Sequence, residues 1–328
     1  MKVLILRFSS IGDIVLTTPV VRCLKKQVPN IELHYATKAG FVGLLKNNPY
    51  IDKIHGLGDN QTEFIQALKT EKFDLIIDLH HNLRTLLIKL KLGVKRHAFD
   101  KINLEKWLMT FFKIDILPYT HIVDRYLETV EKLGVLNDSR GLDFFIDSDT
   151  NLEGIKLPDN YFVYAIGGQH ATKKMPLNKQ IELLMKIDAI VFLIGGKEDI
   201  SAGEDIHAEC KHAINLCGQL SIQQSALLMR GAVEVISHDT GMMHIAAALN
   251  KSIISIWGNT IPGFGMTPYY TENGLNSVYD PIPENPKSTI LQVEDLSCRP
   301  CSKIGYKKCP KGHFKCMNDL NFDSVFED

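Results

Sequence analysis

The sequence predicts an α/β protein with two Rossmann-like halves, each a parallel sheet wound with helices. Short apolar runs alternate with helical patterns over residues 2–80, and the alternation starts again over 161–258. Several of these runs end in glycines or polar residues, which is typical of strands that lead into ligand-binding loops. The chain of 328 residues, 45% of them hydrophobic, is long enough to bury a core in each half.

The first half alternates at the spacing of a parallel sheet, in which every return between strands needs a crossover. Strand-like runs are expected at 2–6, 31–37, 53–57 and 73–80, and helices at 17–29, 39–49 and 61–71. Residues 84–97 have the pattern of a helix with a basic face, and 101–134 are helical in pattern.

Residues 137–160 are rich in Asp, Asn, Gly and Pro and have no strong period, so they are expected to link two domains. The second half then has apolar runs at 161–168, 189–199, 213–218, 233–241 and 252–258, with helical patterns at 178–187, 202–212, 223–232 and 242–249. We therefore expect one domain over 1–150 and another over 151–328.

Composition and termini exclude several classes of protein. The formal net charge of −1 gives no overall attraction to nucleic acid, so no nucleic-acid partner is expected. The strand-length run KVLIL is followed by polar SSIGD, unlike a signal peptide, and no window approaches the ~20 apolar residues of a membrane span. Seven cysteines without an export signal indicate reduced thiols and a cytoplasmic location.

The densest group of chemically active residues follows the apolar run VEVIS. The run delivers His238 and Asp239 to its carboxyl end, and Thr240 and Gly241 form the turn. The helix that follows offers free N–H groups suited to a diphosphate, and His244 lies in its first turn. The alternative is that Asp239 only caps this helix and His244 is an ordinary packed side chain.

Two further turns combine a strand with paired glycines. In AIGGQHATKKMP, backbone at Gly167–Gly168 can approach a ligand, and a following lysine such as Lys173 can neutralise phosphate. The alternative is a basic loop exposed to solvent. LIGGKED repeats the strand and glycine pair, but neither stretch matches the GxGxxG or P-loop pattern.

The first strand-to-helix turn, SSIGD, carries a carboxylate where a phosphate loop would be neutral or basic. Asp13 is therefore either a helix cap or a catalytic base. Ligands of such sheets bind beyond the carboxyl ends of the strands. Asp13, His80, His81, Asn82 and Arg84 are expected there.

Together these stretches resemble the family 9 glycosyltransferases, the lipopolysaccharide heptosyltransferases. The motifs that carry the resemblance are SSIGD, DLHHNLR, TKKMP, GGKED and DTGMMHIAAAL, and they extend over nearly the whole chain. The resemblance implies a GT-B fold, in which two Rossmann-like domains face each other across a cleft. It also implies metal-independent, inverting transfer of heptose from ADP-heptose to a lipopolysaccharide inner-core acceptor, with no cofactor.

The resemblance assigns roles to residues by motif. Asp13 corresponds to the catalytic base, and the donor-binding group comprises Gly168, Gln169, Lys173, Asp239, Thr240, Gly241 and His244. Acceptor contacts are expected from Ser10, Gly12, Asn82 and Arg84. The residues of the GGKED turn, Lys197, Glu198 and Asp199, are not distinguished from one another as nucleoside contacts. Met175 stands where family members often have a tryptophan before the proline.

The basic stretch 84–97 offers a second contact with substrate or membrane. Its cationic residues are Arg84, Lys89, Lys91, Lys95, Arg96 and His97. They are suited to an anionic lipopolysaccharide acceptor or to the cytoplasmic face of the inner membrane, and the alternative is a solvated helix face.

Two questions stay open at the level of sequence. Cys298, Cys301, Cys309 and Cys316 begin with a C-x2-C pair typical of zinc sites, and the alternatives are free thiols or disulfides. The function has alternatives as well: a GT-B transferase or an epimerase for another nucleotide sugar, or a non-catalytic protein that binds one.

Overall fold

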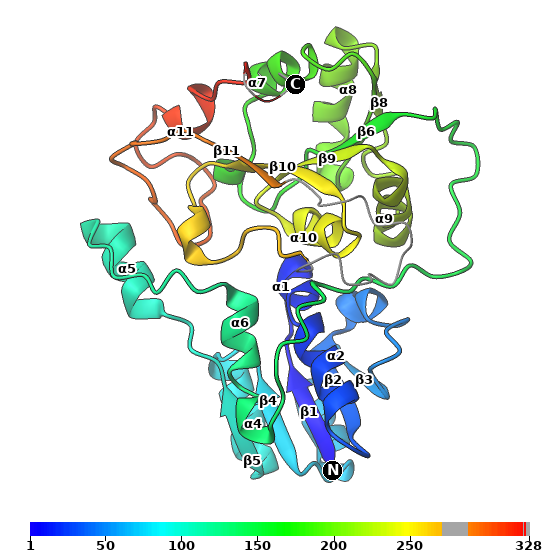
Figure 1. Cartoon of the computed structure of the whole chain (residues 1–328), viewed down its shortest axis with the longest axis vertical. Helices are drawn as coiled ribbons and strands as arrows, with labels where there is room; N and C mark the ends of the chain where they lie inside the picture. Colours follow the sequence, from blue (N-terminus) through cyan, green and yellow to red (C-terminus); the bar gives the residue numbers. More distant parts are fainter. Residues whose placement is uncertain (271–287, 324, 326–328) are drawn as a thin grey trace.

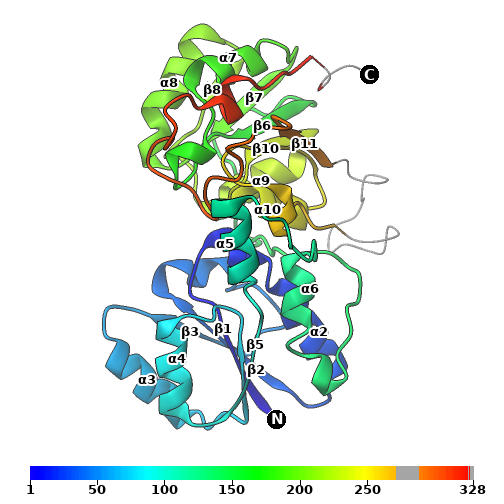
Figure 2. The same cartoon turned by 90° about the vertical axis from the view of Figure 1, so that its left-hand side faces the viewer.

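The computed structural model describes residues 1–270, 288–323 and 325 and has two α/β halves stacked along its long axis (Figure 1). Each half contains one sheet whose paired strands are all parallel. The N-terminus lies at the far end of the first half, and the helix at residues 315–318 lies on the second half (Figure 2). The predicted fold class, two Rossmann-like domains of parallel sheet, is confirmed.

The first sheet has the order β3-β2-β1-β4-β5. Its strands are β1 (Lys2–Leu6), β2 (Glu32–Lys38), β3 (Lys53–Leu57), β4 (Leu75–Asp78) and β5 (Lys95–Ala98). The helices of this half are α1 (Ile11–Val15), α2 (Thr18–Gln27), η1 (Ala39–Leu44), α3 (Gln61–Thr70), α4 (Leu83–Leu92), α5 (Asn103–Phe112), α6 (Ile122–Leu127) and η2 (Glu131–Leu133). β1 is apolar throughout because helices cover both faces of the sheet. Val3 and Ile5 pack into one cluster, and Leu4 and Leu6 into another.

The second sheet has the order β11-β10-β9-β6-β7-β8. Its strands are β6 (Tyr161–Ala165), β7 (Ile190–Ile194), β8 (Ala213–Asn215), β9 (Glu234–His238), β10 (Ser252–Trp257) and β11 (Ser288–Gln292). The helices are η3 (Ala171–Lys173), α7 (Leu177–Leu184), η4 (Lys197–Asp199), α8 (Ile200–Glu209), α9 (Ile222–Gly231), α10 (Gly241–Ala248), η5 (Pro262–Phe264) and α11 (Lys315–Asn318).

The expected elements differ from the structure in a few segments, each for a local reason. The helix expected over 39–49 is a short 3-10 helix, η1. The helix expected over 84–97 ends at Gly93, which has a left-handed φ of 68°, and the chain then pairs with β4 as β5. Within 101–134, α5 stops at Lys113, another left-handed residue, and the helical pattern resumes only at α6. No expectation covered β11.

The connection predicted over 137–160 contains none of the helices or strands above, and polar side chains of both halves hold it. Arg22 on α2 forms ion pairs with Asp138, at 2.7 Å, and with Asp143, at 2.5 Å. Further along, the Asp147 backbone N–H donates to Gln223 of α9. The segment is thus fixed first to one half and then to the other.

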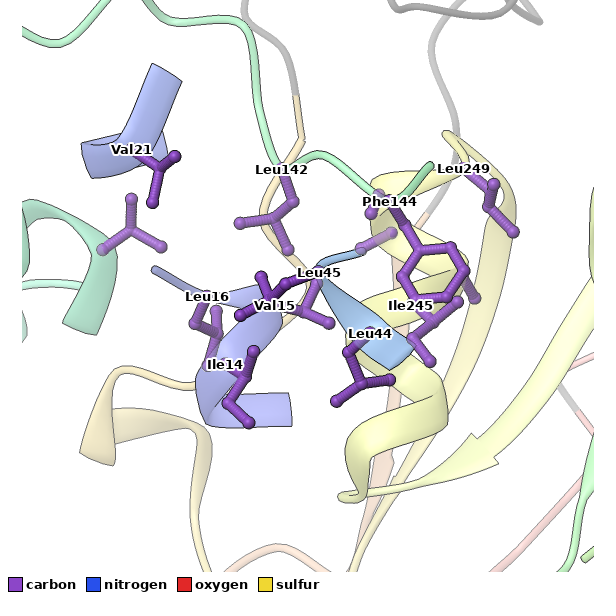
Figure 3. Packing of buried hydrophobic residues seen from close by; sticks show 14 of the residues in the cluster. Ile14, Val15, Leu16, Val21, Leu44, Leu45, Leu142, Phe144, Ile245 and Leu249 are labelled. Atoms are coloured by element: carbon purple, nitrogen blue, oxygen red, sulfur yellow. The ribbon is translucent and has the colours of Figure 1, made fainter. Parts of the chain in front are cut away.

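The two halves share an apolar contact where α1 meets α10. One cluster of buried side chains contains Ile14 of α1, Leu16 directly after it, Ile245 of α10 and Phe144 of the connection (Figure 3). Because these side chains are fully or almost fully buried, the contact is a continuation of the core. It holds the turn after β1 against the turn after β9.

None of the helices in the described part of the chain has the length and apolar character needed to cross a bilayer.

Candidate functional site

Both predicted sites lie where the strand order of a sheet reverses. In the first sheet, β1 and β4 are neighbours, and the chain leaves them toward opposite edges. In the second sheet the same holds for β6 and β9. Open parallel sheets bind ligands in the crevice outside the strand ends at such points. Asp13 follows β1, whereas Gly168 follows β6 and Asp239 follows β9, so the topology places all three at these reversals.

Asp13 is held by two neighbours in the turn between β1 and α1. Its Oδ1 lies 2.5 Å from Nη2 of Arg7, and its Oδ2 accepts from the backbone N–H of Ser10, at 3.0 Å, and from the Ser10 hydroxyl, at 2.7 Å. A carboxylate has about four lone-pair sites, so these contacts leave one on Oδ1. Asp13 is therefore a helix-capping residue, and it still has capacity to accept a proton from a ligand.

Arg7 keeps the Asp13 carboxyl ionised. Burial on its own raises the pKa of Asp13, but the charge of Arg7 and the hydrogen bonds from Ser10 outweigh it and lower the pKa to about 2. Arg7 is itself fixed, because it donates to the carbonyl groups of Ser9 and Leu79 and to the hydroxyl of Tyr126.

Glycines bring the two turns into direct contact. A Cβ placed on Gly12 would lie 2.5 Å from Cδ2 of His244 and 3.2 Å from Cα of Gly241. A Cβ on Gly241 would lie 2.8 Å from Cβ of Ile11. Real Cβ atoms do not approach this closely, so glycine is required on both sides. The structure thus brings His244, predicted on the donor side, against Gly12, predicted on the acceptor side.

His244 is 98% buried at this contact and is electrically neutral near pH 7. Burial lowers the pKa of His244 to about 4, although the carboxylates of Asp239 and Asp13 oppose the shift. Its Nδ1 is buried without a hydrogen-bond partner among the described residues. This imidazole nitrogen is therefore free to form a hydrogen bond with a ligand between the halves.

Lys173 and Asp239 form an ion pair that ties the loop after β6 to the end of β9. Nζ of Lys173 lies 2.6 Å from Oδ2 of Asp239 and also donates to its backbone carbonyl at 3.0 Å. Thr260, in the turn after β10, donates to the same carboxylate oxygen at 2.7 Å. Asp239 does not cap α10, because the N-cap residue is Thr240. The alternative reading of Asp239 as a cap is therefore wrong.

A second ion pair ties the same loop to the turn after β7. Lys174 lies 3.1 Å from Oδ1 of Asp199, which is buried and also accepts from the Gly196 backbone N–H. Of the three candidates in GGKED, Asp199 is therefore engaged inside the protein, whereas Lys197 and Glu198 are exposed.

The glycine loop after β6 places its backbone close to the start of α10. A Cβ on Gly168 would lie 3.3 Å from Cγ2 of Thr240 and 3.3 Å from Cγ of Lys174. Gln169 is exposed beside it. Gly168, Gln169, Lys173, Asp239, Thr240, Gly241 and His244 are therefore brought to one region, around the first turn of α10.

His238 supports this loop from beneath. It is fully buried at the end of β9, and its Nε2 accepts from the backbone N–H of Met175 at 3.0 Å. Burial lowers the pKa of His238 to about 3, which agrees with an imidazole that accepts through Nε2. Met175 packs into the core of the second half, so it fixes the loop from inside.

The predicted acceptor residues have distinct local roles. Ser10 binds Asp13, and Gly12 contacts α10, as described above. Asn82 is the N-cap of α4, and its amide oxygen accepts from the Thr85 backbone N–H at 3.0 Å. Arg84 is half-buried, with its guanidinium 5.8 Å from the ring centre of Phe8.

Several residues near the site have no motif that marks them in the sequence. Arg7 is the foremost, and its only signal is an arginine directly after an apolar strand. Lys101 and Lys106 are half-buried, and their charges act on Asp13. Burial lowers the pKa of Lys106 to about 8. They lie in a stretch that the sequence presents only as helical, so nothing there distinguishes them from surface lysines.

The four cysteines of the C-terminal segment are free thiols, which argues against the disulfide alternative. Sγ of Cys298 lies 3.9 Å from Nε2 of His313. Among the described residues of this segment, no three potential metal ligands have their ligand atoms within 4.8 Å of one another. One group of three elsewhere in the described chain does. The expected zinc geometry is therefore not formed in this conformation.

That closer group comprises His34 of β2, His55 of β3 and Glu71, which follows α3. Nδ1 of His34 and Nε2 of His55 lie 3.0 Å apart. The carboxylate of Glu71 is already paired with Lys2 at 3.2 Å and with Lys53 at 2.5 Å. Two ammonium groups at the only carboxylate of the group disfavour a divalent cation there.

Comparison with known proteins identifies the family of this chain. The family model described as glycosyltransferase family 9 (heptosyltransferase) matches residues 61–306. Lipopolysaccharide heptosyltransferase 1 of Campylobacter coli is 27% identical over 314 residues, covering 85% of this chain and 89% of the relative.

Solved structures of low identity share the fold. E. coli ADP-heptose lipopolysaccharide heptosyltransferase II superposes with a TM-score of 0.69 at 17% identity, covering 97% of this chain and 98% of that one. E. coli heptosyltransferase WaaC with ADP gives a TM-score of 0.67 at 20% identity, covering 88% and 92%.

The family model covers well over half of the chain, and the relative matches across both halves. The chain is therefore a glycosyltransferase and belongs to family 9, the heptosyltransferases of lipopolysaccharide biosynthesis.

Proposed function

We propose that this protein transfers heptose from ADP-heptose to an inner-core lipopolysaccharide acceptor, with inversion at the anomeric carbon and without a metal ion. In this proposal residues 1–150 bind the acceptor and residues 151–328 bind the nucleotide sugar. The observation that carries it is the juxtaposition of an ionised carboxylate, Asp13, with the first turn of α10 through the Gly12–Gly241 contact.

The leaving diphosphate would bind at the start of α10. The free N–H groups of its first turn and its dipole favour negative charge. Lys173, held next to this turn by Asp239, adds a full positive charge. With no metal in the proposed reaction, these groups supply the stabilisation that the departing phosphate oxygens need.

Asp13 would take the proton of the acceptor hydroxyl as that oxygen attacks the anomeric carbon. A single displacement of this kind inverts the configuration, and the base lies on the face opposite the leaving group. The low pKa of Asp13 means that it is ionised at any working pH. Arg7 fixes one side of the carboxylate, so that the remaining lone pair of Oδ1 has a defined direction.

The acceptor is a lipid-linked, anionic glycan, so the proposed site of action is the cytoplasmic face of the inner membrane, which the protein contacts peripherally. The half-buried lysines Lys101 and Lys106 near Asp13 provide positive charge for such an acceptor.

A donor screen followed by a transfer assay tests the proposal. ADP is expected to raise the melting temperature more than UDP or GDP, and ADP-heptose is expected to support transfer in the presence of a chelator. Asp13→Asn is expected to retain ADP binding while transfer falls by about two to four orders of magnitude. Preferential stabilisation by UDP would overturn the donor assignment, and near-normal turnover by folded Asp13→Asn would overturn the base assignment.

A further inference from the structure

Two successive helices of the first half display apolar side chains to solvent. The α4–α5 surface is defined here as the exposed large apolar residues of α4, α5 and the chain that follows α5: Leu83, Leu86, Leu87, Leu90, Leu104, Trp107, Phe111, Phe112, Ile114, Ile116 and Tyr119. Leu83 is 85% exposed and Phe111 is 64% exposed. Among the described residues, about half of all exposed large apolar side chains lie in this short part of the chain.

On α4 the exposed leucines form one continuous face. Leu83, Leu87 and Leu90 follow the i, i+4, i+7 spacing of a helix surface. The opposite face, with Thr85 and Ile88, is buried against the sheet. A helix that only packs on its own sheet would show polar residues to water, so this outward face is apolar for another reason.

On α5 the arrangement is similar and includes aromatic rings. Leu104, Trp107 and Phe111 lie on the exposed face, and the ring of Trp107 lies 5.9 Å from that of Phe111 and 5.0 Å from that of Phe112. Polar and cationic contacts anchor the helix to the second half. Nζ of Lys106 lies 5.6 Å from the ring centre of Phe264, and Lys113 donates to the Pro300 carbonyl at 2.5 Å. The aromatic face is thus presented outward from a fixed helix.

The same part of the chain is strongly basic. Residues 83–119 contain eight Lys and Arg against three Asp and Glu, in a protein whose formal net charge is −1. The exposed cations are Lys91, Lys95, Arg96 and Lys113. Apolar and aromatic side chains bordered by cations match the interfacial region of an anionic bilayer, where Trp is favoured and basic residues pair with lipid headgroups.

The position of the surface relates it to the site. In Figure 2, α5 lies where the two halves meet, and α4 lies lower, along the first half. α4 begins directly after β4, at the strand ends where Asp13 lies, and its first turn includes Arg84. A lipid held at this surface would therefore have its headgroup next to the proposed acceptor side.

We infer that the α4–α5 surface docks peripherally on a bilayer of anionic lipids, with Trp107 and Phe111 inserted at the headgroup level. The inference deepens the proposed function and rests on it for its purpose, since it brings a lipid-linked acceptor to Asp13. The docking itself is measurable without any transfer reaction.

The protein has a built-in reporter of this contact. It has two tryptophans, of which Trp257 is 1% exposed and Trp107 is 42% exposed. Vesicles of phosphatidylglycerol and phosphatidylcholine are expected to shift the tryptophan emission to the blue, whereas phosphatidylcholine alone has a much smaller effect. High salt is expected to weaken the response, because lysine and arginine attract the anionic headgroups.

Substitutions test whether vesicle binding depends on the α4–α5 surface or on exposed apolar residues in general. The triple variant Leu104→Gln, Phe111→Gln, Phe112→Gln keeps Trp107 and is expected to bind the anionic vesicles at least about tenfold more weakly. Lys91→Glu with Lys95→Glu and Arg96→Glu is expected to remove the preference for anionic lipid. The matched control Leu136→Gln, Leu157→Gln, Met185→Gln changes three exposed apolar residues elsewhere and is expected to bind as the parent does.

Two readouts decide the outcome. The triple variant is expected to transfer normally to a water-soluble, delipidated acceptor and poorly to acceptor in vesicles. If the parent protein binds the vesicles but transfers heptose to neither acceptor, the proposed function is contradicted and the docking inference stands. No spectral shift and no sedimentation with anionic vesicles would overturn the docking inference. The docking inference would also be overturned if the parent protein did not bind vesicles but formed a concentration-dependent dimer that the triple substitution abolished. The surface would then bind a second copy of the chain.

Discussion

Nη2 of Arg7 and Oδ1 of Asp13 lie 2.5 Å apart, and this ion pair sets the protonation state of the proposed base. Both residues come from one turn, six positions apart, yet they perform different tasks. Asp13 faces the second half of the protein, whereas Arg7 is 93% buried and directs its other donors into the first half. The carboxylate is thus held in place by an arginine that is itself immobilised.

Replacing Arg7 is expected to move the acid limb of the pH–rate profile. In Arg7→Met the lowering by the guanidinium is lost, while burial still raises and the hydrogen bonds from Ser10 still lower the pKa of Asp13, so this pKa rises from about 2 toward the ordinary 3.8. Transfer rates of this variant should therefore decline below about pH 5, where the parent stays level. Arg7→Lys keeps the charge and serves as the control. An unchanged profile in folded Arg7→Met would contradict the role of the pair.

Asp13 should also contribute to stability at acid pH. Its pKa is depressed in the folded protein, so its contribution is complete above the unfolded value of 3.8 and is lost as the pH falls toward 2. The two pKa values correspond to a contribution on the order of 2 kcal/mol. Denaturant titrations between about pH 5 and pH 3 should show a steeper loss in the parent than in Asp13→Asn. Parallel curves would contradict the shift.

His244 gives an opposite case, in which the uncharged form is favoured by folding. Its folded pKa of about 4 lies below the ordinary 6.5, so the unfolded chain binds more protons between these values and stability falls as the pH drops through this window. Melting temperatures of the parent should decrease from about pH 7 to pH 5 more than those of His244→Gln. Other buried histidines such as His238 add to the decrease in both proteins, so the comparison isolates one residue.

Lys173 should matter more for nucleotide binding than for stability. Lys173→Met removes the cation that the ion pair with Asp239 holds beside the start of α10. ADP should then bind about tenfold to a hundredfold more weakly, as loss of a charged hydrogen bond predicts. The control is Lys186→Met, which removes a surface cation paired with Asp323 at 2.7 Å. Calorimetric titration with ADP measures both. Equal ADP affinities of the two variants would show that Lys173 does not contribute to nucleotide binding.

Gly12→Ala tests the contact between the halves. The new Cβ would approach His244 to 2.5 Å, so the side chains must shift and the turn must move away from α10. We expect a loss of stability of about 1–3 kcal/mol, typical of overpacking, and a reduced transfer rate with little change in ADP affinity. Gly43→Ala, where a Cβ meets nothing within 4 Å, is the matched control. Thermal melts and steady-state kinetics check both.

The elements that the sequence predicted best are those in which burial and local pattern agree. Runs such as 2–6 and 161–168 are apolar on both faces because helices cover both sides of the sheets, and this leaves an unmistakable pattern. The glycine turns were found for a related reason, because close packing leaves no room for a Cβ at Gly12 or Gly241 and little room at Gly168. β5 was missed since its residues are mostly exposed at a sheet edge and resemble a continued basic helix.

Other features depend on partners far away in the chain. Nothing near residue 12 indicates that it meets residue 241, and nothing near Lys173 indicates that Asp239 binds it. The roles of Asn82 as a cap and of Asp199 as an ion-pair partner follow from three-dimensional neighbours as well. Helical periodicity marks α4 and α5 as helical, but it does not say whether their apolar faces point to the core or to solvent, and the structure exposes them.

The Gly12–Gly241 contact has a consequence for motion. With no side chain between them, the backbones of Gly12 and Gly241 lie in direct contact. The apolar residues of α1 and α10 hold the two halves together around this contact. Rotation of one half about this pivot would displace the outer rims widely and the groups next to it very little. In such a motion substrates would enter and products would leave at the rim, while Asp13 and His244 would keep their mutual distance. The two glycines would thus place the pivot between the halves beside the proposed base.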